Sequence, residues 1–331
     1  MRHRTRSPGA LGCPPARLDA GLSAVEDLLE SRVEHRDPFI AEANAHLLLA
    51  GGKRFRPLLT MLTAELGSGI SPEVIAAAAG VELTHLASLY HDDVMDEADT
   101  RRGSPSANAK YDNSTAILVG DLLFGTASDI IADLGPEAVK IQSQTFIRLC
   151  SGQIRDDRPC PPGTDPHAYY LGVLADKTGV LIATAARYGA LLSGCSRETI
   201  DVVREYGERI GIAFQLADDL IDISSTGEVL GKMPGTDIRE GKRTLPIIYA
   251  LESTDPADVR LQELLRQPTH TEAELAESSP LLRVHPAMDR ARAETLAMAL
   301  AAQDVLSRPL PDGEIKAALG HLALRVVQRD Q

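Results

Sequence analysis

Apolar residues recur at helical spacing along nearly the whole chain from Leu18 onward. Leu18, Leu22, Val25 and Leu29 follow one another at intervals of three or four residues, and residues 40–48 repeat the pattern. This spacing places apolar side chains on one face of an α-helix. Further helices are predicted at residues 115–134, 136–151, 169–193, 197–223, 245–251, 272–277, 288–306 and 312–329. Because strand alternation is not evident anywhere, the pattern predicts an all-α fold.

Turn and cap residues divide these helices. Ser71-Pro72 is typical of a helix start, with an N-cap followed by Pro at the first helical position, and this helix is expected to reach the aspartates at 92–96. Loops rich in Gly, Pro and charge are predicted at residues 100–113, 155–166, 224–243 and 266–286. None resembles an interdomain linker, so we predict one domain over residues 18–331. Residues 1–17 lack the apolar stretch of a secretory signal and are expected to be a disordered tail, with a processed leader as the alternative.

Composition and charge narrow the possible partners. The chain has 331 residues, 44% of them hydrophobic, 4% aromatic and no Trp, which favours helix-on-helix packing. Its 34 basic and 47 acidic residues give a net charge of −13, so nucleic acid is not an expected partner. No apolar stretch reaches the roughly 18 uncharged residues that a membrane span needs, so no transmembrane segment is predicted. The scattered cysteines indicate reduced thiols, and a cytoplasmic location is expected.

Two aspartate clusters are the first candidates for chemistry. In Asp92-Asp93-Val94-Met95-Asp96, the first and last aspartates lie one helical turn apart on the same face. The same Asp-Asp-x-x-Asp spacing returns at 218–222, inside an apolar helix. Carboxylate oxygens suit Mg²⁺, which typically binds one or two carboxylates together with substrate phosphate oxygens. For the first cluster alone, a solvated helix end paired with Arg101 and Arg102 is the favoured interpretation. The repetition favours metal sites.

Basic residues accompany these clusters although the chain is acidic overall. Lys53 and Arg56 lie three residues apart at a predicted helix start, where free backbone N–H groups favour an anion. Further basic residues follow at Arg101-Arg102, Lys177, Lys232 and Lys242. His85 precedes Asp92 by two turns on nearly the same face. A patch that balances the acidic surface is the alternative for each segment alone, but their combination predicts an anion site.

The sequence closely resembles the trans-prenyl diphosphate synthases, the polyprenyl synthetase family. The matching stretches occur in family order: GGKRFRPLL (51–59), HDDVMDEADTRRG (91–103), KTG (177–179), FQLADDLID (214–222) and GKMPGTDIREGKRTLPIIYAL (231–251). The resemblance implies a single-domain, isoprenoid synthase-like helical bundle around a deep central cavity, and a homodimer. It also implies an enzyme that condenses isopentenyl diphosphate with an allylic diphosphate in head-to-tail (E) fashion and releases pyrophosphate.

The resemblance further assigns roles to individual residues. Isopentenyl diphosphate would lie against Lys53, Arg56, His85 and Arg102. The allylic diphosphate would lie against Arg101, Lys177 and Lys232, with Thr178 and Gln215 assisting and Lys242 helping to close the site. Asp92 and Asp96 would hold two Mg²⁺ ions and Asp218 a third. Asp93, Asp219 and Asp222 would orient water and ligands, although Asp222 could also reach the metal. The implied catalytic set is Asp92, Asp93, Asp96, Arg101, Lys177, Asp218 and Lys232.

Product length depends on the helix that leads into Asp92. Short-chain members of the family often carry bulky aromatics four or five residues before the first aspartate, whereas this chain has Ser88 and Ala87. On a helix, Ser88 lies roughly 6 Å and Thr84 roughly 12 Å below Asp92. We therefore predict an open floor and a product longer than C20, in the range C30–C50. The alternative is that Phe124, Phe146 or Leu149 closes the tunnel sooner and gives a C15 or C20 product.

Two other functions compete with this one. A class I terpene cyclase also uses Asp-Asp-x-x-Asp and magnesium, but its second metal motif typically contains Asn or Asp, Ser or Thr, and Glu. It also needs no isopentenyl site. A non-catalytic subunit of a heteromeric prenyl synthase is the second competitor, although such subunits usually lose an aspartate cluster, and both clusters are present here.

Overall fold

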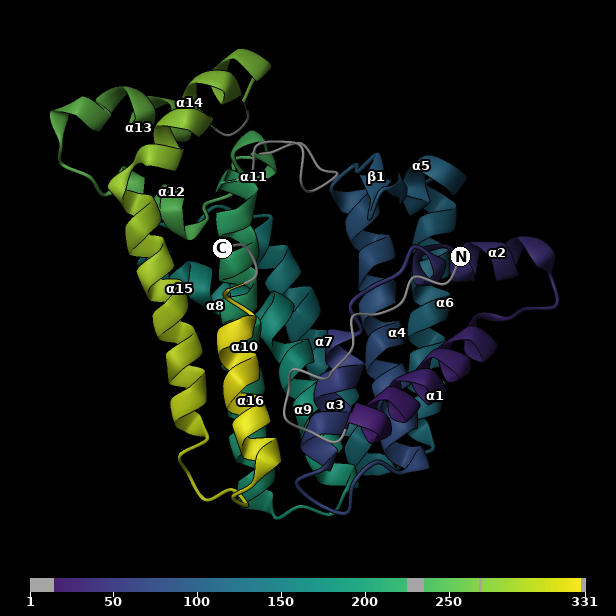
Figure 1. Cartoon of the computed structure of the whole chain (residues 1–331). Helices are drawn as coiled ribbons and strands as arrows, with labels where there is room; N and C mark the ends of the chain where they lie inside the picture. The colour runs from purple at the N-terminus through teal and green to yellow at the C-terminus, as the bar shows by residue number, and fades with distance from the viewer. Residues whose placement is uncertain (1–14, 225–234, 268–269, 329–331) are drawn as a thin grey trace. The chain divides into compact units, whose positions relative to one another are not determined.

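The computed structural model describes residues 15–224, 235–267 and 270–328, and these residues are almost entirely helical (Figure 1). The all-α prediction is confirmed. By its internal contacts the chain divides into two compact units. Unit 1 comprises residues 1–146, 181–207 and 306–321, and unit 2 comprises residues 147–180, 208–305 and 322–331. The prediction of one domain over residues 18–331 stays a prediction.

Unit 1 is built from the N-terminal helices together with parts of later ones. Its elements are α1 (Pro15–Val33), α2 (Pro38–Leu49), α3 (Phe55–Ala64), α4 (Pro72–Met95), β1 (Thr100–Arg101), β2 (Ser104–Pro105), α5 (Ala107–Tyr111), α6 (Asn113–Ala132) and the first part of α7 (Pro136–Asp156). Most of α9 (Val180–Leu192), the first part of α10 (Arg197–Ser224) and most of α16 (Glu314–Arg325) complete it.

Helix α4 is the centre of unit 1. It packs against α1, α3 and α6, and α4 and α6 run side by side in Figure 1. Its start follows the predicted cap, because the Ser71 hydroxyl accepts a hydrogen bond from the Val74 backbone N–H and Pro72 occupies the first turn. Leu83, Leu86 and Tyr90 on α4 are fully buried in the apolar core of this unit. The helix ends at Met95, so the first aspartate cluster occupies its last turn.

The segment after α4 differs from the loop predicted at residues 100–113. It forms an antiparallel pair, β1 with β2, in which Thr100 pairs with Pro105 and Arg101 with Ser104. The one-turn helix α5 follows and is capped by Ser106. The pair is only two residues long on each side, too short for an alternating pattern to be visible in the sequence.

Unit 2 contains the C-terminal part of α7, followed by α8 (Pro166–Leu174) and a π-helical turn, η1 (Ala175–Gly179). Residues 208–224 of α10, α11 (Thr236–Arg239), α12 (Leu245–Leu251), η2 (Pro256–Asp258), α13 (Val259–Leu265), α14 (Glu272–Val284) and α15 (Pro286–Val305) complete its elements. Leu216 and Leu220 of α10 are buried in an apolar core with Tyr170 of α8 and Ile248 of α12. Helix α12 packs in turn on α15 and α8.

Two predicted loops of unit 2 contain helices. Helix α11 lies in the stretch predicted as a loop at residues 224–243. Helix α14 continues to Val284, well beyond the predicted end at residue 277, and includes Pro280. It is stabilised by a capping box between Thr271 and Glu274, and Ser278 and Leu282 are completely buried. Tertiary packing therefore outweighs the helix-breaking tendency of proline here.

Two further expectations can be compared with the structure. Cys150, Cys160 and Cys195 are free thiols, as expected, whereas Cys13 lies outside the described residues. Among the described helices, α6 is long and apolar enough to cross a membrane by length and composition alone. It carries Asp121 and Asp129, and 39% of its most apolar window is buried in the protein.

Candidate functional site

The first aspartate cluster is divided between solvent and protein. Asp96 is exposed at the C-terminal end of α4, and Asp92 is half-buried one turn before it. Asp93 has no exposed surface, and its carboxylate forms an ion pair with Arg101 and accepts a hydrogen bond from the Ala107 backbone N–H at 3.0 Å. Asp93 therefore connects the end of α4 to β1 and α5. The alternative interpretation, in which the cluster pairs with Arg101, therefore holds for Asp93, although this ion pair lies inside the protein and not at a solvated helix end.

The glycine-rich turn before α3 is fixed by Arg54, a residue to which the sequence assigned no role. Arg54 has a left-handed backbone (φ 45°), and its buried guanidinium pairs with Glu82 at 3.2 Å and with Glu26 at its other edge. Arg102 donates to the carbonyl of Gly51. A Cβ added to Gly52 would lie 2.8 Å from Arg54 Nη1 and 3.1 Å from Arg102 Nη1. Glycine thus lets two guanidiniums approach this turn.

Four arginines surround His85 on α4. Burial, followed by the charges of Arg56, Arg102, Arg101 and Arg54, lowers the pKa of His85 well below its ordinary value. The pKa of Arg102 is also lowered, by loss of hydration and by its arginine neighbours. The structure therefore gathers the predicted residues Arg56, His85 and Arg102 into one electropositive cluster. Lys53 is exposed on the turn that leads into Arg56.

The positions predicted to set product length lie on the preceding turns of α4. Ser88 is half-buried and donates to the His85 carbonyl at 2.8 Å. Ala87 is buried in the core of unit 1, and Thr84 accepts a hydrogen bond from Gln142 Nε2 of α7 at 2.7 Å. Phe124 and Phe146, on α6 and α7, stack with ring centroids 3.8 Å apart. The bridge from α7 to Thr84 was not indicated by any pattern in the sequence.

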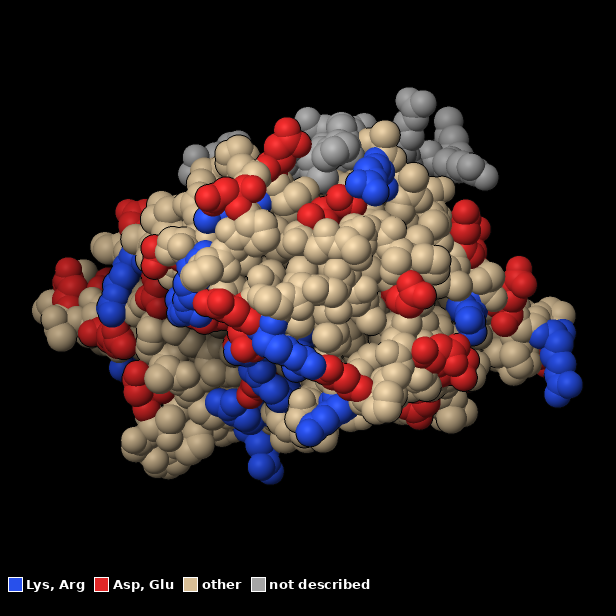
Figure 2. Space-filling model, turned by 90° about the horizontal axis from the view of Figure 1, so that it is seen from below, with Lys and Arg blue, Asp and Glu red and all other residues tan. Residues whose placement is uncertain are grey.

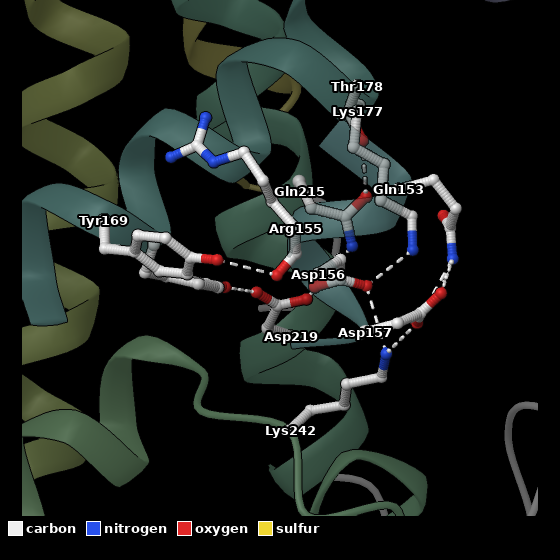
Figure 3. Close-up of polar contacts among 11 residues, drawn as sticks. Gln153, Arg155, Asp156, Asp157, Tyr169, Lys177, Thr178, Gln215, Asp219 and Lys242 are labelled. Carbon is white, nitrogen blue, oxygen red and sulfur yellow. Dashed lines mark hydrogen bonds and ion pairs between the residues drawn. The ribbon is translucent and has the colours of Figure 1, made fainter. Parts of the chain in front are cut away.

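The second aspartate cluster lies on α10 in unit 2. Asp218 is half-buried, whereas Asp219 is 7% exposed and accepts hydrogen bonds from Tyr170 and, at 3.0 Å, from Gln215 (Figure 3). Burial, helped by the negative charges of Asp218 and Asp156, raises the pKa of Asp219 to about 7 despite these hydrogen bonds. Carboxylates are therefore crowded at this end of α10.

Two lysines face an aspartate that the sequence did not single out. Lys177 Nζ lies 2.8 Å and Lys242 Nζ 3.1 Å from the same oxygen of Asp156, and Lys242 also pairs with Asp157 (Figure 3). Although burial opposes ionisation, the two lysines hold the pKa of Asp156 below its usual range. The Thr178 hydroxyl donates to Gln215 at 3.2 Å. Lys177 and Lys242 thus meet at Asp156, and Thr178 meets Gln215, while the roles that the resemblance assigns to these residues stay predictions.

Asp222, a candidate metal ligand, accepts hydrogen bonds from the backbone N–H groups of Thr236 and Asp237 at 3.3 and 3.1 Å. It therefore anchors α11. Burial and the neighbouring carboxylates, Asp219 and Asp222 first among them, raise the pKa of Asp237 well above its ordinary value. Lys232 lies outside the described residues, so its predicted role is not tested.

Sequence reasoning missed Asp156, Tyr170 and Asp237. The only available sign was the Asp156-Asp157 pair close behind Gly152, which fell at the edge of a predicted loop. Across the part of the chain that the structure describes, no group of three His, Cys, Asp or Glu side chains is arranged to hold a metal by itself. A magnesium site that takes one or two carboxylates and completes its shell with substrate phosphates needs no such group.

The chain is similar to enzymes that join isoprenoid diphosphates. The polyprenyl synthetase family model matches residues 37–280, and the chain belongs to this family. It is therefore a metal-dependent prenyltransferase, and more particularly a trans-prenyl diphosphate synthase.

Individual relatives cover nearly the whole chain. The nonaprenyl diphosphate synthase of Mycobacterium tuberculosis is 45% identical over 95% of this chain and 94% of its own. The geranylgeranyl pyrophosphate synthase of Corynebacterium glutamicum, complexed with calcium and isoprenyl diphosphate, is 40% identical with a TM-score of 0.84 over 99% of both chains. The polyprenyl synthase of Caulobacter crescentus, also with calcium and isoprenyl diphosphate, is 31% identical with a TM-score of 0.89 over 99% and 100%.

Proposed function

We propose that this chain uses Mg²⁺ to condense isopentenyl diphosphate with an allylic diphosphate in the head-to-tail (E) sense, and that its product is longer than C20, in the range C30–C50. The observation that carries the length is the pair of small side chains, Ala87 and Ser88, one turn below Asp92 on α4. The 45% identity to a nonaprenyl diphosphate synthase supports the same range.

Isopentenyl diphosphate binds, in this proposal, to the cluster around His85 in unit 1. A neutral imidazole can donate one hydrogen bond to a diphosphate oxygen, while Lys53, Arg56 and Arg102 supply the positive charge. Arg54 is not part of this set, because its guanidinium is already engaged by Glu26 and Glu82.

The allylic diphosphate binds to Arg101, Lys177 and Lys232, assisted by Thr178 and Gln215, and Lys242 closes the site. The ion pairs of Lys177 and Lys242 with Asp156 hold both ammonium groups near each other before the substrate arrives. Neither lysine then needs to be ordered at the moment of binding, which lowers the entropic cost of gripping the diphosphate.

Magnesium fits these residues. Asp92, Asp96 and Asp218 offer carboxylate oxygens. Burial is the main cause of the raised pKa values of Asp219 and Asp237, and the neighbouring carboxylates add to it, so a divalent cation would offset negative charge there. We propose three Mg²⁺ ions, two held by Asp92 and Asp96 and one by Asp218. Magnesium held by these residues would neutralise the charge of the departing pyrophosphate and so favour cleavage of the allylic C–O bond.

A second candidate is synthesis of a C20 or shorter product. The hydrogen bond from Gln142 to Thr84 spans the face of α4 roughly 12 Å below Asp92 and would stop a growing chain there. The 40% identity to a geranylgeranyl pyrophosphate synthase is in line with this candidate.

The test is to incubate the purified chain with Mg²⁺, isopentenyl diphosphate and C10, C15 or C20 primers, and to size the extracted products by chromatography. Products of C30–C50 that shorten in Ala87→Phe support the first candidate. A C15 or C20 product that lengthens in Gln142→Ala establishes the second. Pyrophosphate release by the chain alone excludes a non-catalytic subunit, and removal of divalent metal with EDTA should abolish it.

We further propose a homodimer located in the cytoplasm, without nucleic acid or a membrane span. Ile117, Leu118 and Leu122 expose apolar surface along α6, with Leu118 66% exposed, and a second copy of the chain would cover them. On the face drawn in Figure 2, basic side chains lie among acidic ones. Light scattering should give twice the mass of the chain, and Leu118→Asp should give the monomer.

A further inference from the structure

Lys177 and Thr178 lie inside the π-helical turn η1, between α8 and α9. The Val180 backbone N–H donates to the carbonyl of Ala175, five residues earlier. A π-turn inserts one extra residue into a helix, is intrinsically less stable than an α-turn and often marks a functional site. Something in the surrounding structure must therefore hold this turn.

The carboxylate of Asp176 lies between two arginines of α7. Arg148 Nε contacts one carboxylate oxygen at 2.8 Å and Arg155 Nη1 contacts the other at 3.0 Å. Arg148 also pairs with Glu208 of α10 at 2.6 Å. Both oxygens of Asp176 are thus engaged, and each arginine comes from a different turn of α7.

Between these two arginines, the backbones of α7 and η1 are in direct contact. A Cβ added to Gly152 would lie 2.5 Å from the Lys177 backbone nitrogen and 2.8 Å from the Asp176 carbonyl carbon. The π-turn therefore packs against Gly152, and the arginines before and after this glycine on α7 both bind its Asp176 side chain.

The two side chains that follow Asp176 make contacts in the region where the allylic diphosphate is proposed to bind. Lys177 reaches Asp156, and Thr178 reaches Gln215 (Figure 3). If the π-turn relaxed to an ordinary α-turn, the register would shift by one residue, which is a rotation of about 100° about the helix axis. Such a rotation would carry the Lys177 ammonium away from Asp156.

We propose that Asp176 is a positioning residue: held by Arg148 and Arg155, it fixes the π-turn so that Lys177 and Thr178 face the allylic diphosphate. The proposal rests on the assignment of Lys177 to the allylic diphosphate made above. Asp176 itself contacts no reacting group. Its carboxylate acts only through the turn that it anchors.

The test compares Michaelis constants for the two substrates. Asp176→Asn keeps the shape of the side chain and removes its charge. It should raise KM for the allylic primer about tenfold, the effect expected when one charge-assisted contact is weakened, and change KM for isopentenyl diphosphate less than twofold. Glu137→Gln, which removes the charge of an exposed pair with Arg197, is the matched control and should leave both constants unchanged.

A double variant separates positioning from general damage. Lys177→Ala alone should raise KM for the primer, and adding Asp176→Asn to it should raise KM by less than Asp176→Asn does in the wild type, because only the contribution of Thr178 then remains to be lost. Equal increases in both Michaelis constants, independent effects in the double variant, or an unchanged Asp176→Asn enzyme would overturn the proposal while leaving the proposed function intact. If Lys177→Ala leaves KM for the primer unchanged, the assignment of Lys177 fails and the positioning role fails with it. Circular dichroism and unfolding midpoints identify any variant that is misfolded.

Discussion

The histidine at the centre of the arginine cluster gives a quantitative prediction about pH. Burial, together with the charges of Arg56, Arg102, Arg101 and Arg54, holds the pKa of His85 well below 6.5. The unfolded chain has no such environment. Below pH 6.5 the unfolded state therefore takes up a proton on this side chain that the folded state does not bind.

The sign and size of the effect follow from this difference in proton uptake. Because the pKa is depressed in the folded state, stability is complete above pH 6.5 and falls as the pH drops towards the folded-state pKa. From pH 7.5 to pH 5.5, this one group should lower the free energy of unfolding by about 1 kcal/mol. Replacing His85 with Gln removes the group and with it this share of the pH dependence.

The assay is urea unfolding followed by circular dichroism at pH 7.5 and pH 5.5, on the wild-type chain and on His85→Gln without substrate. The wild type should lose about 1 kcal/mol more than the variant between the two pH values. Other titrating groups contribute equally to both proteins and cancel in the comparison. Identical losses in the two proteins, or a larger loss in the variant, would refute the picture of a neutral imidazole among arginines.

Two further predictions concern stability. Glu82→Gln should lower the free energy of unfolding by about 3 kcal/mol, because it leaves the buried guanidinium of Arg54 with one carboxylate fewer. A decrease of less than about 0.5 kcal/mol in urea unfolding would contradict the burial of this pair. Gly189→Ala should also destabilise, by about 3 kcal/mol, because its Cβ would lie 2.0 Å from the carbonyl oxygen of Thr60. A loss of less than about 0.5 kcal/mol in urea unfolding would show that α9 does not pack closely against Thr60 of α3 at this glycine.

The helices and the charged motifs were predictable because both leave local marks in the sequence. Ser71 and Pro72 indicate the start of α4, and the spacing of its apolar residues predicts that the helix continues to Asp92. The residues that bind substrate in the proposed function were recognisable from short motifs whose order along the chain is itself specific. Such patterns depend only on residues that lie close together in the sequence.

The parts that could not be predicted depend on contacts between distant residues. Pro280 reads as a helix breaker, yet α14 continues through it because Ser278 and Leu282 are buried against the rest of unit 2. The π-turn at 175–179 depends on Arg148 and Arg155 of another helix, and no local pattern distinguishes it from an α-helix. Asp156 acquires its importance only when two lysines from separate segments meet it.

The burial of Asp93 changes what the five-residue aspartate motif encodes. Its carboxylate pairs with Arg101 and accepts a hydrogen bond from Ala107 at the start of α5, whereas Asp96 in the same motif is exposed to solvent. Selection for cellular abundance alone should therefore preserve position 93 and tolerate change at position 96. If Asp96 holds magnesium as we propose, selection for turnover should preserve both positions, and a mutational library scored for both traits would separate the two constraints.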